Sequence, residues 1–365
     1  MVGLYIHIPF CHSKCAYCDF YSLGRKDVEK EKRFLEALKK EWLRRKSEIN
    51  GEIRTLYIGG GTPSYLHPSC LSELLNISSC LPEIEEFTVE VNPEDVTPDL
   101  CGILTDAGVN RVSMGVQSLI ATELAEIGRR HTPAKAIEAV GLLRRYGIHN
   151  ISCDLIFGLP EQSVASWTTS LRQMLELRPE HISSYLLSYE PCTRLTARLK
   201  RGLLLETPEE TIEQMYSVLC AETSRAGYEH YEISNFALPG FKSRHNSAYW
   251  NYTPYLGLGP GAHSFDGNTR SFNRSNLKDY IATDGEINEK ETLTSVEVRN
   301  EKVMLALRTA DGLDLTDFSD SEQLLKDARK YIRQGILCID ESSKRLKMSE
   351  KYWLITDSVL SDLFI

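Results

Sequence analysis

Three cysteines stand close together near the start of the chain. Cys11, Cys15 and Cys18 are spaced Cys-x3-Cys-x2-Cys, directly after a short apolar stretch that ends at a proline. Thiolates this dense on one loop suit a zinc ion or an iron–sulfur cluster, because several sulfurs must reach one small centre. Zinc would need a fourth ligand, which His7 or His12 could supply, and its ligands usually come as two separated pairs. The residues alone therefore favour a cluster over zinc and make disulfides the poorer interpretation.

A glycine-rich turn is the second feature that could do chemistry. Gly59, Gly60, Gly61 and Thr62 follow the predicted strand 55–58. Glycine lets the main chain adopt positive φ and press against a ligand. Glycine-rich turns are also common as plain tight turns, so this signal is weak by itself.

Polar side chains within or just after other predicted strands are further candidates. Glu90 and Asp154 stand in apolar segments, where a carboxylate either faces solvent or is held by a partner or a ligand. Gln117 ends another strand, and Arg129 or Arg130 follows on a helical segment, where arginine is usually a solvated residue. These residues become a site only if the fold brings them together.

A histidine and two aromatic residues form a separate group in the second half of the chain. His245, Tyr249 and Trp250 lie in the segment Arg-His-Asn-Ser-Ala-Tyr-Trp, and His263 follows a glycine-rich loop. Histidine can ligate haem iron, and aromatic faces can cover a porphyrin. By residue type alone, a structural histidine satisfied by hydrogen bonds is the expected interpretation, because unligated histidines greatly outnumber haem ligands.

Six predicted strands alternate with helices in the first 205 residues. The strands cover residues 4–8, 55–58, 87–91, 111–116, 151–156 and 181–187. This alternation requires a parallel sheet with helical crossovers. Ligands bind such sheets at the carboxyl ends of the strands, where most of the candidate residues fall. The pattern does not distinguish a partial barrel from an open, doubly wound sheet.

The rest of the chain is predicted to form two smaller units. Residues 206–290 contain a helix and a polar, glycine-rich region, and residues 291–365 read as a small helical domain with a wing-like hairpin at 337–348. A winged-helix shape invites a DNA-binding interpretation. The chain has 42 basic and 51 acidic residues, a net charge of −9, so we expect a packing role and no nucleic-acid partner.

The composition also indicates a compartment. The seven cysteines outside the loop are scattered singly, which is not a disulfide framework. No basic and apolar leader opens the sequence, and no apolar run of about 18 residues or more, the length of a spanning helix, occurs. We expect a cytoplasmic protein with reduced thiols, and peripheral membrane contact stays open.

The cysteine loop, read as Tyr-Ile-His-Ile-Pro-Phe-Cys and Lys-Cys-Ala-Tyr-Cys-Asp-Phe, resembles that of the radical S-adenosylmethionine (SAM) proteins. The resemblance is closer to the branch that contains oxygen-independent coproporphyrinogen III oxidase (HemN) and the HemW-type haem chaperones. It implies an α/β fold, a partial (β/α)6 barrel with a smaller C-terminal α+β, winged-helix-like domain. It also implies a [4Fe-4S] cluster on the three cysteines, with the fourth iron chelated by SAM. The SAM pocket that it implies consists of Tyr5, Gly60, Gly61, Thr62, Glu90, Gln117, Arg129 and Asp154, with Tyr17 beside the cluster.

The same resemblance gives the histidine segment a role. Its pattern His-Asn-x-x-Tyr-Trp is similar to the HemW-type motif that is implicated in haem binding, so His245, Tyr249 and Trp250 become haem candidates, with His263 as a weaker alternative ligand.

Two departures from the oxidase favour the chaperone branch. The oxidase has an extra cysteine two residues beyond the third cluster ligand, where this chain has Phe20, and a long extension before the loop, where this chain has ten residues before Cys11. We therefore expect a protein that captures haem and passes it to an acceptor protein not yet identified. The alternatives are the radical SAM decarboxylase of coproporphyrinogen and a zinc-stabilised binding protein.

Overall fold

A strongly curved sheet forms the centre of the computed structural model, which describes residues 2–24, 27–81, 84–286 and 289–365. Six parallel strands pair in chain order along most of this sheet. They are β1 (Val2–Ile8), β2 (Ile53–Gly60), β3 (Glu86–Val91), β4 (Arg111–Gln117), β5 (Asn150–Phe157) and β6 (His181–Leu186). The six predicted strands are thus confirmed, with bounds shifted by one or two residues.

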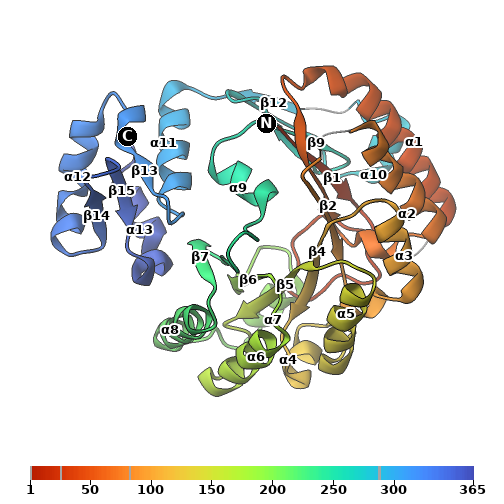
Figure 1. Ribbon diagram of the computed structural model, residues 1–365, viewed down its shortest axis with the longest axis horizontal. Coiled ribbons are helices and arrows are strands. Elements are labelled where there is room, and N and C mark those ends of the chain that lie inside the picture. The colour runs from red at the N-terminus through yellow and green to blue at the C-terminus, as the bar shows by residue number, and fades with distance from the viewer. Residues whose placement is uncertain (1, 25–26, 82–83, 287–288) are drawn as a thin grey trace.

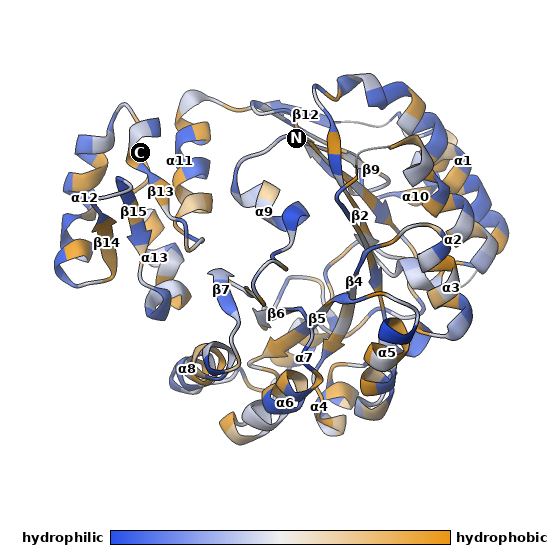
Figure 2. Cartoon of the chain, viewed as in Figure 1, coloured by the Kyte–Doolittle hydropathy of each residue, from blue (hydrophilic) through white to orange (hydrophobic). Residues whose placement is uncertain are grey.

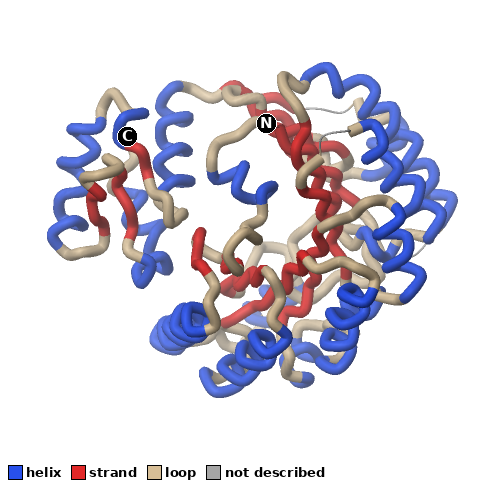
Figure 3. Tube along the Cα trace, in the orientation of Figure 1, coloured by secondary structure: helices blue, strands red, loops and turns tan. Residues whose placement is uncertain are grey.

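Helices follow these strands and cover the outer, convex side of the sheet (Figures 1 and 3). They are α1 (Val28–Arg45), α2 (Pro68–Leu75), α3 (Pro98–Asp106), α4 (Ala121–Glu126), α5 (Pro133–Arg145) and α6 (Val164–Leu177). Side-chain caps fix the starts of all of these helices except α4. The Asp27 carboxylate accepts from the amide of Lys30, and Ser163 forms a capping box with Ser166. The curvature with helices on one side confirms the α/β barrel-like fold.

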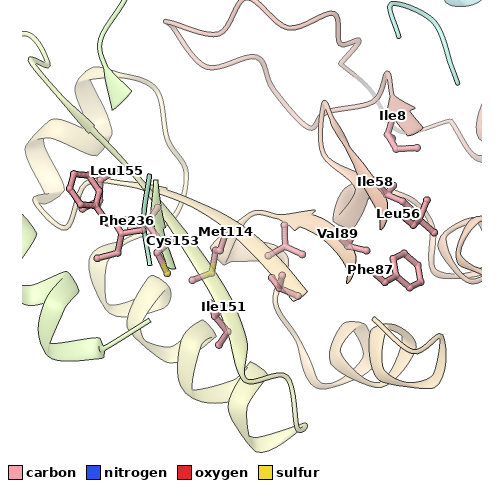
Figure 4. Close-up of a cluster of buried hydrophobic side chains, with 14 of the residues drawn as sticks. Ile8, Leu56, Ile58, Phe87, Val89, Met114, Ile151, Cys153, Leu155 and Phe236 are labelled. Carbon is pink, nitrogen blue, oxygen red and sulfur yellow. The ribbon is translucent and has the colours of Figure 1, made fainter. Parts of the chain in front are cut away.

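The parallel strands alternate between apolar and polar residues, and this alternation creates the lumen. Ile58, Val89 and Met114 point toward the helices and are fully buried in the core, which Figure 4 shows in close-up. Burying a side chain of this kind contributes about 1.5–3 kcal/mol. The intervening positions, such as Glu90 and Asp154, face the concave side, because successive side chains of a strand point to opposite faces. Figure 2 shows both hydropathy classes along these strands.

The polar region before residue 272 is more regular than we predicted. It contains β9 (Tyr255–Leu258), β10 (His263–Phe265) and β11 (Thr269–Phe272), which continue the sheet beyond β1 and end on β12 (Glu289–Thr292). At the other edge, β8 (Asn235–Ala237) and β7 (Glu229–Glu232) add antiparallel strands to β6. Pairing with an existing sheet edge stabilised these short strands despite their weak intrinsic propensity.

Three further helices flank the barrel, and a small unit stands beside it. The flanking helices are α7 (Arg194–Lys200), α8 (Glu209–Arg225) and α10 (Leu277–Ala282). The small unit contains α11 (Ser295–Ala306), β13 (Leu313–Asp314), α12 (Ser321–Arg333), β14 (Leu337–Asp340), β15 (Arg345–Met348) and α13 (Thr356–Ser361). Its three strands form a separate antiparallel sheet, in which the predicted hairpin is β14 and β15. Within the described ranges, no helix combines the length and apolarity needed to cross a bilayer.

Candidate functional site

The cysteine loop begins directly after β1 and is held against the barrel by backbone hydrogen bonds. The amide of Cys11 donates to the carbonyl of Leu23 (3.0 Å), and the amide of Ala16 donates to the carbonyl of Ile127 (3.0 Å). Cys11, Cys15 and Cys18 are half-buried free thiols, and all three line one pocket. Three thiols on one anchored loop, facing one pocket, fit the donor set of an iron–sulfur cluster.

The glycine turn after β2 packs directly under this loop. The amide of Gly61 donates to the carbonyl of Ile8 (2.8 Å), and the amide of Thr62 donates to that of Phe10 (2.7 Å). Gly60 has φ +104°, and a Cβ at Gly61 would stand 2.4 Å from the Phe10 carbonyl oxygen. The glycines are therefore needed so that the turn can approach the loop, and the Thr62 hydroxyl donates to the sulfur of Cys11 (3.3 Å).

The pocket extends from the loop into the lumen and has a volume of about 540 Å³, within the usual range of small-ligand sites. Predicted site residues from the ends of four strands and the following loops border it. They are Cys11, Cys15, Tyr17, Cys18, Gly60, Gly61, Thr62, Glu90, Gln117, Arg129 and Asp154. The fold thus brings together eleven residues that are scattered over more than 140 positions of the chain.

Arg129 connects the pocket with the cysteine loop. One guanidinium nitrogen donates to the amide oxygen of Asn92 (2.8 Å) and to the Gly115 carbonyl, and the other donates to the sulfur of Cys15 (3.5 Å). Its Nε is buried and has no hydrogen-bond partner among the described residues. A buried donor without a partner costs about 1–3 kcal/mol, which a ligand acceptor would recover. Arg130, the alternative in the sequence, also borders the pocket, but its guanidinium pairs with Glu94 (2.8 Å).

Two carboxyl groups in the lumen have raised pKa values. Burial raises the pKa of Glu90 to about 7 and that of Asp154 to about 6. Glu90 accepts hydrogen bonds from the hydroxyl of Tyr57 (2.8 Å) and the amide of Gly60 (3.0 Å). Asp154 accepts one from Ser113 (3.4 Å). Both groups therefore titrate near neutral pH inside the pocket.

A strained backbone conformation occurs at the edge of the same pocket. Gln117 ends β4 with φ 69°, in the left-handed region that a side chain other than glycine rarely occupies, and the β4–β5 register shifts there. Strain of this kind costs on the order of 1–3 kcal/mol and concentrates at ligand sites.

The predicted haem segment forms a short helix, α9 (Arg244–Trp250), at the opposite end of the lumen. Glu86, the first residue of β3, accepts hydrogen bonds from the amides of Arg244 (2.8 Å) and His245 (2.9 Å). A carboxylate at a helix N-terminus satisfies free amides and complements the helix dipole. The helix is therefore fixed to the amino-terminal ends of the strands.

His245 is buried and fully hydrogen-bonded in this arrangement. Its Nδ1 pairs with the hydroxyl of Thr55 (2.8 Å) and its Nε2 with that of Tyr249 (2.8 Å). Burial lowers the pKa of His245 to about 3, so the imidazole is neutral. Iron ligation would require one of these two hydroxyl partners to be exchanged.

One ring contact and one hydrogen bond, both made by Tyr57, connect the ends of the lumen. The ring of Tyr57 lies 5.2 Å from that of His245, and its hydroxyl reaches Glu90. Asn246, the residue after His245, lines the same pocket as the three cysteines. The two predicted sites are thus neighbours in one lumen.

Five predicted residues do not border the pocket. Tyr5 faces inward from β1, and its hydroxyl lies 3.0 Å from Nδ1 of His7. His245 and Tyr249 are hydrogen-bonded to each other, and Trp250 is half-exposed at the end of α9. His263 is exposed on β10, where its ring stacks on that of Phe272 with 5.2 Å between centroids.

Several pocket residues were absent from the sequence predictions. Tyr57, Arg111, Ser113, Ser183 and Asn246 line the lumen beside the predicted carboxylates. Tyr57, Arg111, Ser113 and Ser183 lie on β2, β4 and β6, beside the strands of Glu90 and Asp154. Counting every second residue back from the predicted Gln117 on β4 reaches Ser113 and Arg111, so this alternation could have found those two. Asn246 is the asparagine of the His-Asn-x-x-Tyr-Trp pattern, and that pattern is the signal that could have identified it.

Similarity to known proteins agrees with this geometry. Residues 5–174 match the Radical SAM superfamily, and residues 293–351 match the HemN C-terminal domain. Coproporphyrinogen III oxidase (HemN) from Escherichia coli is similar in structure, with a TM-score of 0.84, 24% identity, and coverage of 100% of this chain and 90% of that one. Fold and cysteine site together define a radical SAM protein.

Proteins with similar sequences identify the family within this class. The chain is 35% identical to the heme chaperone HemW of Lactococcus lactis over 99% of this chain and 97% of that protein. It is 38% identical to HemW of Escherichia coli over 72% of this chain and 70% of that protein. The chain belongs to the HemW family.

Proposed function

We propose that this protein is a haem chaperone, which binds haem and transfers it to an acceptor protein, and that it carries a [4Fe-4S] cluster and SAM as cofactors. The observation that carries this proposal is the pairing, within one barrel lumen, of a three-cysteine loop at one end with the His-Asn-x-x-Tyr-Trp helix at the other. The full-length relatives named heme chaperones support it.

Cys11, Cys15 and Cys18 would hold the cluster, and Arg129 and Glu90 would bind SAM. The Nε of Arg129, which no described residue pairs with, suits the carboxylate of the amino acid part of SAM, and an ionised Glu90 suits its cationic groups. When bound, a cluster with SAM supplies one-electron chemistry. Asp154, Gln117 and the other predicted lining residues complete the wall of this pocket.

Haem is the cargo, and we place it at α9. His245 would ligate the iron, with Tyr249 and Trp250 beside the porphyrin and His263 as the weaker alternative ligand. Because both nitrogens of His245 are engaged, loading of haem would exchange the Thr55 or the Tyr249 hydroxyl for iron. Haem release to the acceptor would restore that bond, so α9 has a stable state without cargo.

The remaining partners follow from charge and composition. A net charge of −9 gives no field that attracts nucleic acid, so we propose no nucleic-acid partner. We also propose that the acceptor is a protein and that the exchange takes place in the cytoplasm.

A transfer assay tests the function. Haem-loaded, cluster-reconstituted protein is mixed with a large excess of an apo-globin, and the shift of the Soret band to the globin position is followed with and without SAM. We expect transfer with one haem released per chain. Formation of protoporphyrinogen IX from coproporphyrinogen III under anaerobic reducing conditions, with no haem binding, would replace the proposal by the decarboxylase alternative.

A further inference from the structure

Three metal-ligating side chains meet far from the cysteine loop, where the barrel joins the C-terminal unit. Cys220 comes from α8, His230 from β7, and Glu350 from the segment directly after β15. Nδ1 of His230 lies 2.6 Å from a carboxylate oxygen of Glu350 and 4.0 Å from the sulfur of Cys220, and all three ligand atoms lie within 4.8 Å of one another. They are separated by up to 130 positions in the sequence, so the fold assembles this group.

The spacing of the three atoms suits a tetrahedral cation. Typical zinc bonds of about 2.3 Å to sulfur and about 2.0–2.1 Å to nitrogen or oxygen place the ligand atoms roughly 3.3–3.6 Å apart. The distance from His230 to Glu350, 2.6 Å, is shorter than this range, and the distance from His230 to Cys220, 4.0 Å, is longer. Side-chain adjustments of less than about 1 Å would bring both distances into the range. A thiolate, an imidazole and a carboxylate together are the ligand types of Zn²⁺ and Co²⁺.

The surroundings hold the imidazole in place. The His230 side chain is 5% exposed, its ring is stacked on Phe236 (3.9 Å between centroids), and Trp353 packs against it edge-on (4.4 Å). Its other nitrogen, Nε2, is buried and has no hydrogen-bond partner among the described residues, so packing fixes the ring with Nδ1 toward Cys220 and Glu350. The hydroxyl of Tyr216 donates to the carbonyl of Glu350 (3.1 Å) and ties down the third ligand segment.

The three ligand side chains are more accessible to solvent than those of a closed structural metal site. Cys220 is half-buried, whereas the side chain of Glu350 is 50% exposed. One side of the triad therefore faces solvent, which leaves room for water as a fourth ligand. Three protein ligands with one open position distinguish this group from a four-ligand structural zinc site.

We propose that Cys220, His230 and Glu350 form a second metal site, which binds one Zn²⁺ or a similar divalent cation and fastens the C-terminal unit to the barrel. On binding, the Cys220 thiol loses its proton to solvent and its sulfur bonds to the metal. The proton between Nδ1 of His230 and Glu350 moves to Nε2 or to solvent, so that Nδ1 and the carboxylate can also bond to the metal. Because two of the ligands belong to α8 and β7 and the third lies beyond β15, the bound metal bridges the two parts of the molecule. The site does not depend on the proposed haem function.

Metal content tests the proposal. Full-length protein with its cluster reconstituted to four iron and four sulfide per chain is incubated with Zn²⁺, desalted and analysed for zinc. We expect one Zn²⁺ retained per chain in the native sequence and in Cys338→Ser, which replaces an exposed cysteine on β14. In Cys220→Ser and Glu350→Gln we expect at least a tenfold weaker affinity for zinc, with iron unchanged.

A second readout keeps the proposal open to contradiction if Cys220→Ser is unstable. X-ray absorption at the zinc edge of the native protein should show one sulfur among the ligands, and zinc should raise the melting temperature of the native protein but not of Glu350→Gln, a change of a half-exposed side chain. Equal zinc retention in all four proteins, no retention in any, or a ligand shell without sulfur would each overturn the site.

Discussion

The two ends of the barrel lumen differ in how completely their polar groups are satisfied. At the carboxyl ends of the strands, Arg129 keeps a buried nitrogen that has no partner in the described part of the chain, Glu90 has a pKa near 7, and Gln117 is strained. At the amino ends, both nitrogens of His245 are paired and Glu86 caps α9. The cysteine end has unmet interactions for a ligand to satisfy, whereas the α9 end has few.

This difference separates two kinds of binding. A site with unmet hydrogen bonds gains the full interaction energy from its ligand, while a satisfied site must first give up a bond of its own. We infer that the cofactors bind to a preformed pocket and that haem binding is coupled to a rearrangement at α9. A variant that changes one end of the lumen should leave the other end unchanged, so the second end serves as a control.

Loss of a loop cysteine should have the largest effect. In Cys15→Ala, iron content after anaerobic reconstitution should fall from about four per chain toward zero, because a four-iron cluster requires its thiolate ligands. The matched control is Cys80→Ala, an exposed cysteine outside the loop, which should keep its iron. Full absorbance of the cluster band in Cys15→Ala would refute the assignment of the loop.

Removal of the Arg129 guanidinium should have the second-largest effect. Arg129→Ala should weaken SAM binding by about 10- to 100-fold, since hydrogen bonds to charged groups contribute about 1.5–3 kcal/mol. Arg130→Ala, which removes a partly exposed ion pair with Glu94, should change the affinity by less than threefold. Equilibrium dialysis with labelled SAM gives both numbers, and equal losses in the two variants would contradict a specific role for Arg129.

The titration of Glu90 should make SAM binding depend on pH. Between pH 6 and 8 the carboxyl loses its proton, so the affinity for the cationic ligand should rise, by up to about tenfold, and Glu90→Gln should remove this dependence. Without ligand, the effect of this proton on stability has the opposite sign, because a rise in pH destabilises the folded protein. The native state holds this proton up to about pH 7 while the unfolded state loses it near pH 4.5, so the contribution to the free energy of unfolding falls as pH rises between these values. A pH-independent affinity in the native protein would contradict the assignment.

A change at the satisfied end should have a smaller effect and the opposite sign. Thr55→Val removes a hydroxyl partner of His245 and should destabilise the protein by about 1–2 kcal/mol while strengthening haem binding a few-fold, because the competing bond is gone. Thr88→Val is the control, since that buried hydroxyl has no partner among the described residues. Urea unfolding and haem titration measure both effects. Weaker haem binding in Thr55→Val would contradict exchange of the Thr55 hydroxyl and leave the Tyr249 hydroxyl as the exchanged partner.

The cysteine end of the lumen could be predicted from the sequence more completely than the α9 end, for a physical reason. The loop, the glycine turn and the inward carboxylates are signalled locally by spacing and by strand alternation, and the parallel topology gathers them at one edge. Tyr57 and Arg111 obey the same alternation but were missed, because tyrosine and arginine in a strand do not stand out as Glu90 and Asp154 do.

The environment of His245 could not be read from the sequence. Its partners Thr55 and Tyr249 and the cap Glu86 come together only after α9 returns to the start of β2 and β3, some 160 to 190 positions away. The strands β9 to β11 were missed for a related reason: they pair with an edge that other segments create. Non-local pairing overrides the weak local preference in both cases.

A haem titration followed at the Soret band tests the division of the lumen most directly. Cluster-reconstituted native protein and His245→Ala are compared, with iron content and SAM affinity measured on the same samples. We predict stoichiometric haem binding in the native protein and binding at least tenfold weaker in His245→Ala, with cluster and SAM binding unchanged. Equal haem affinity in the two proteins would contradict it.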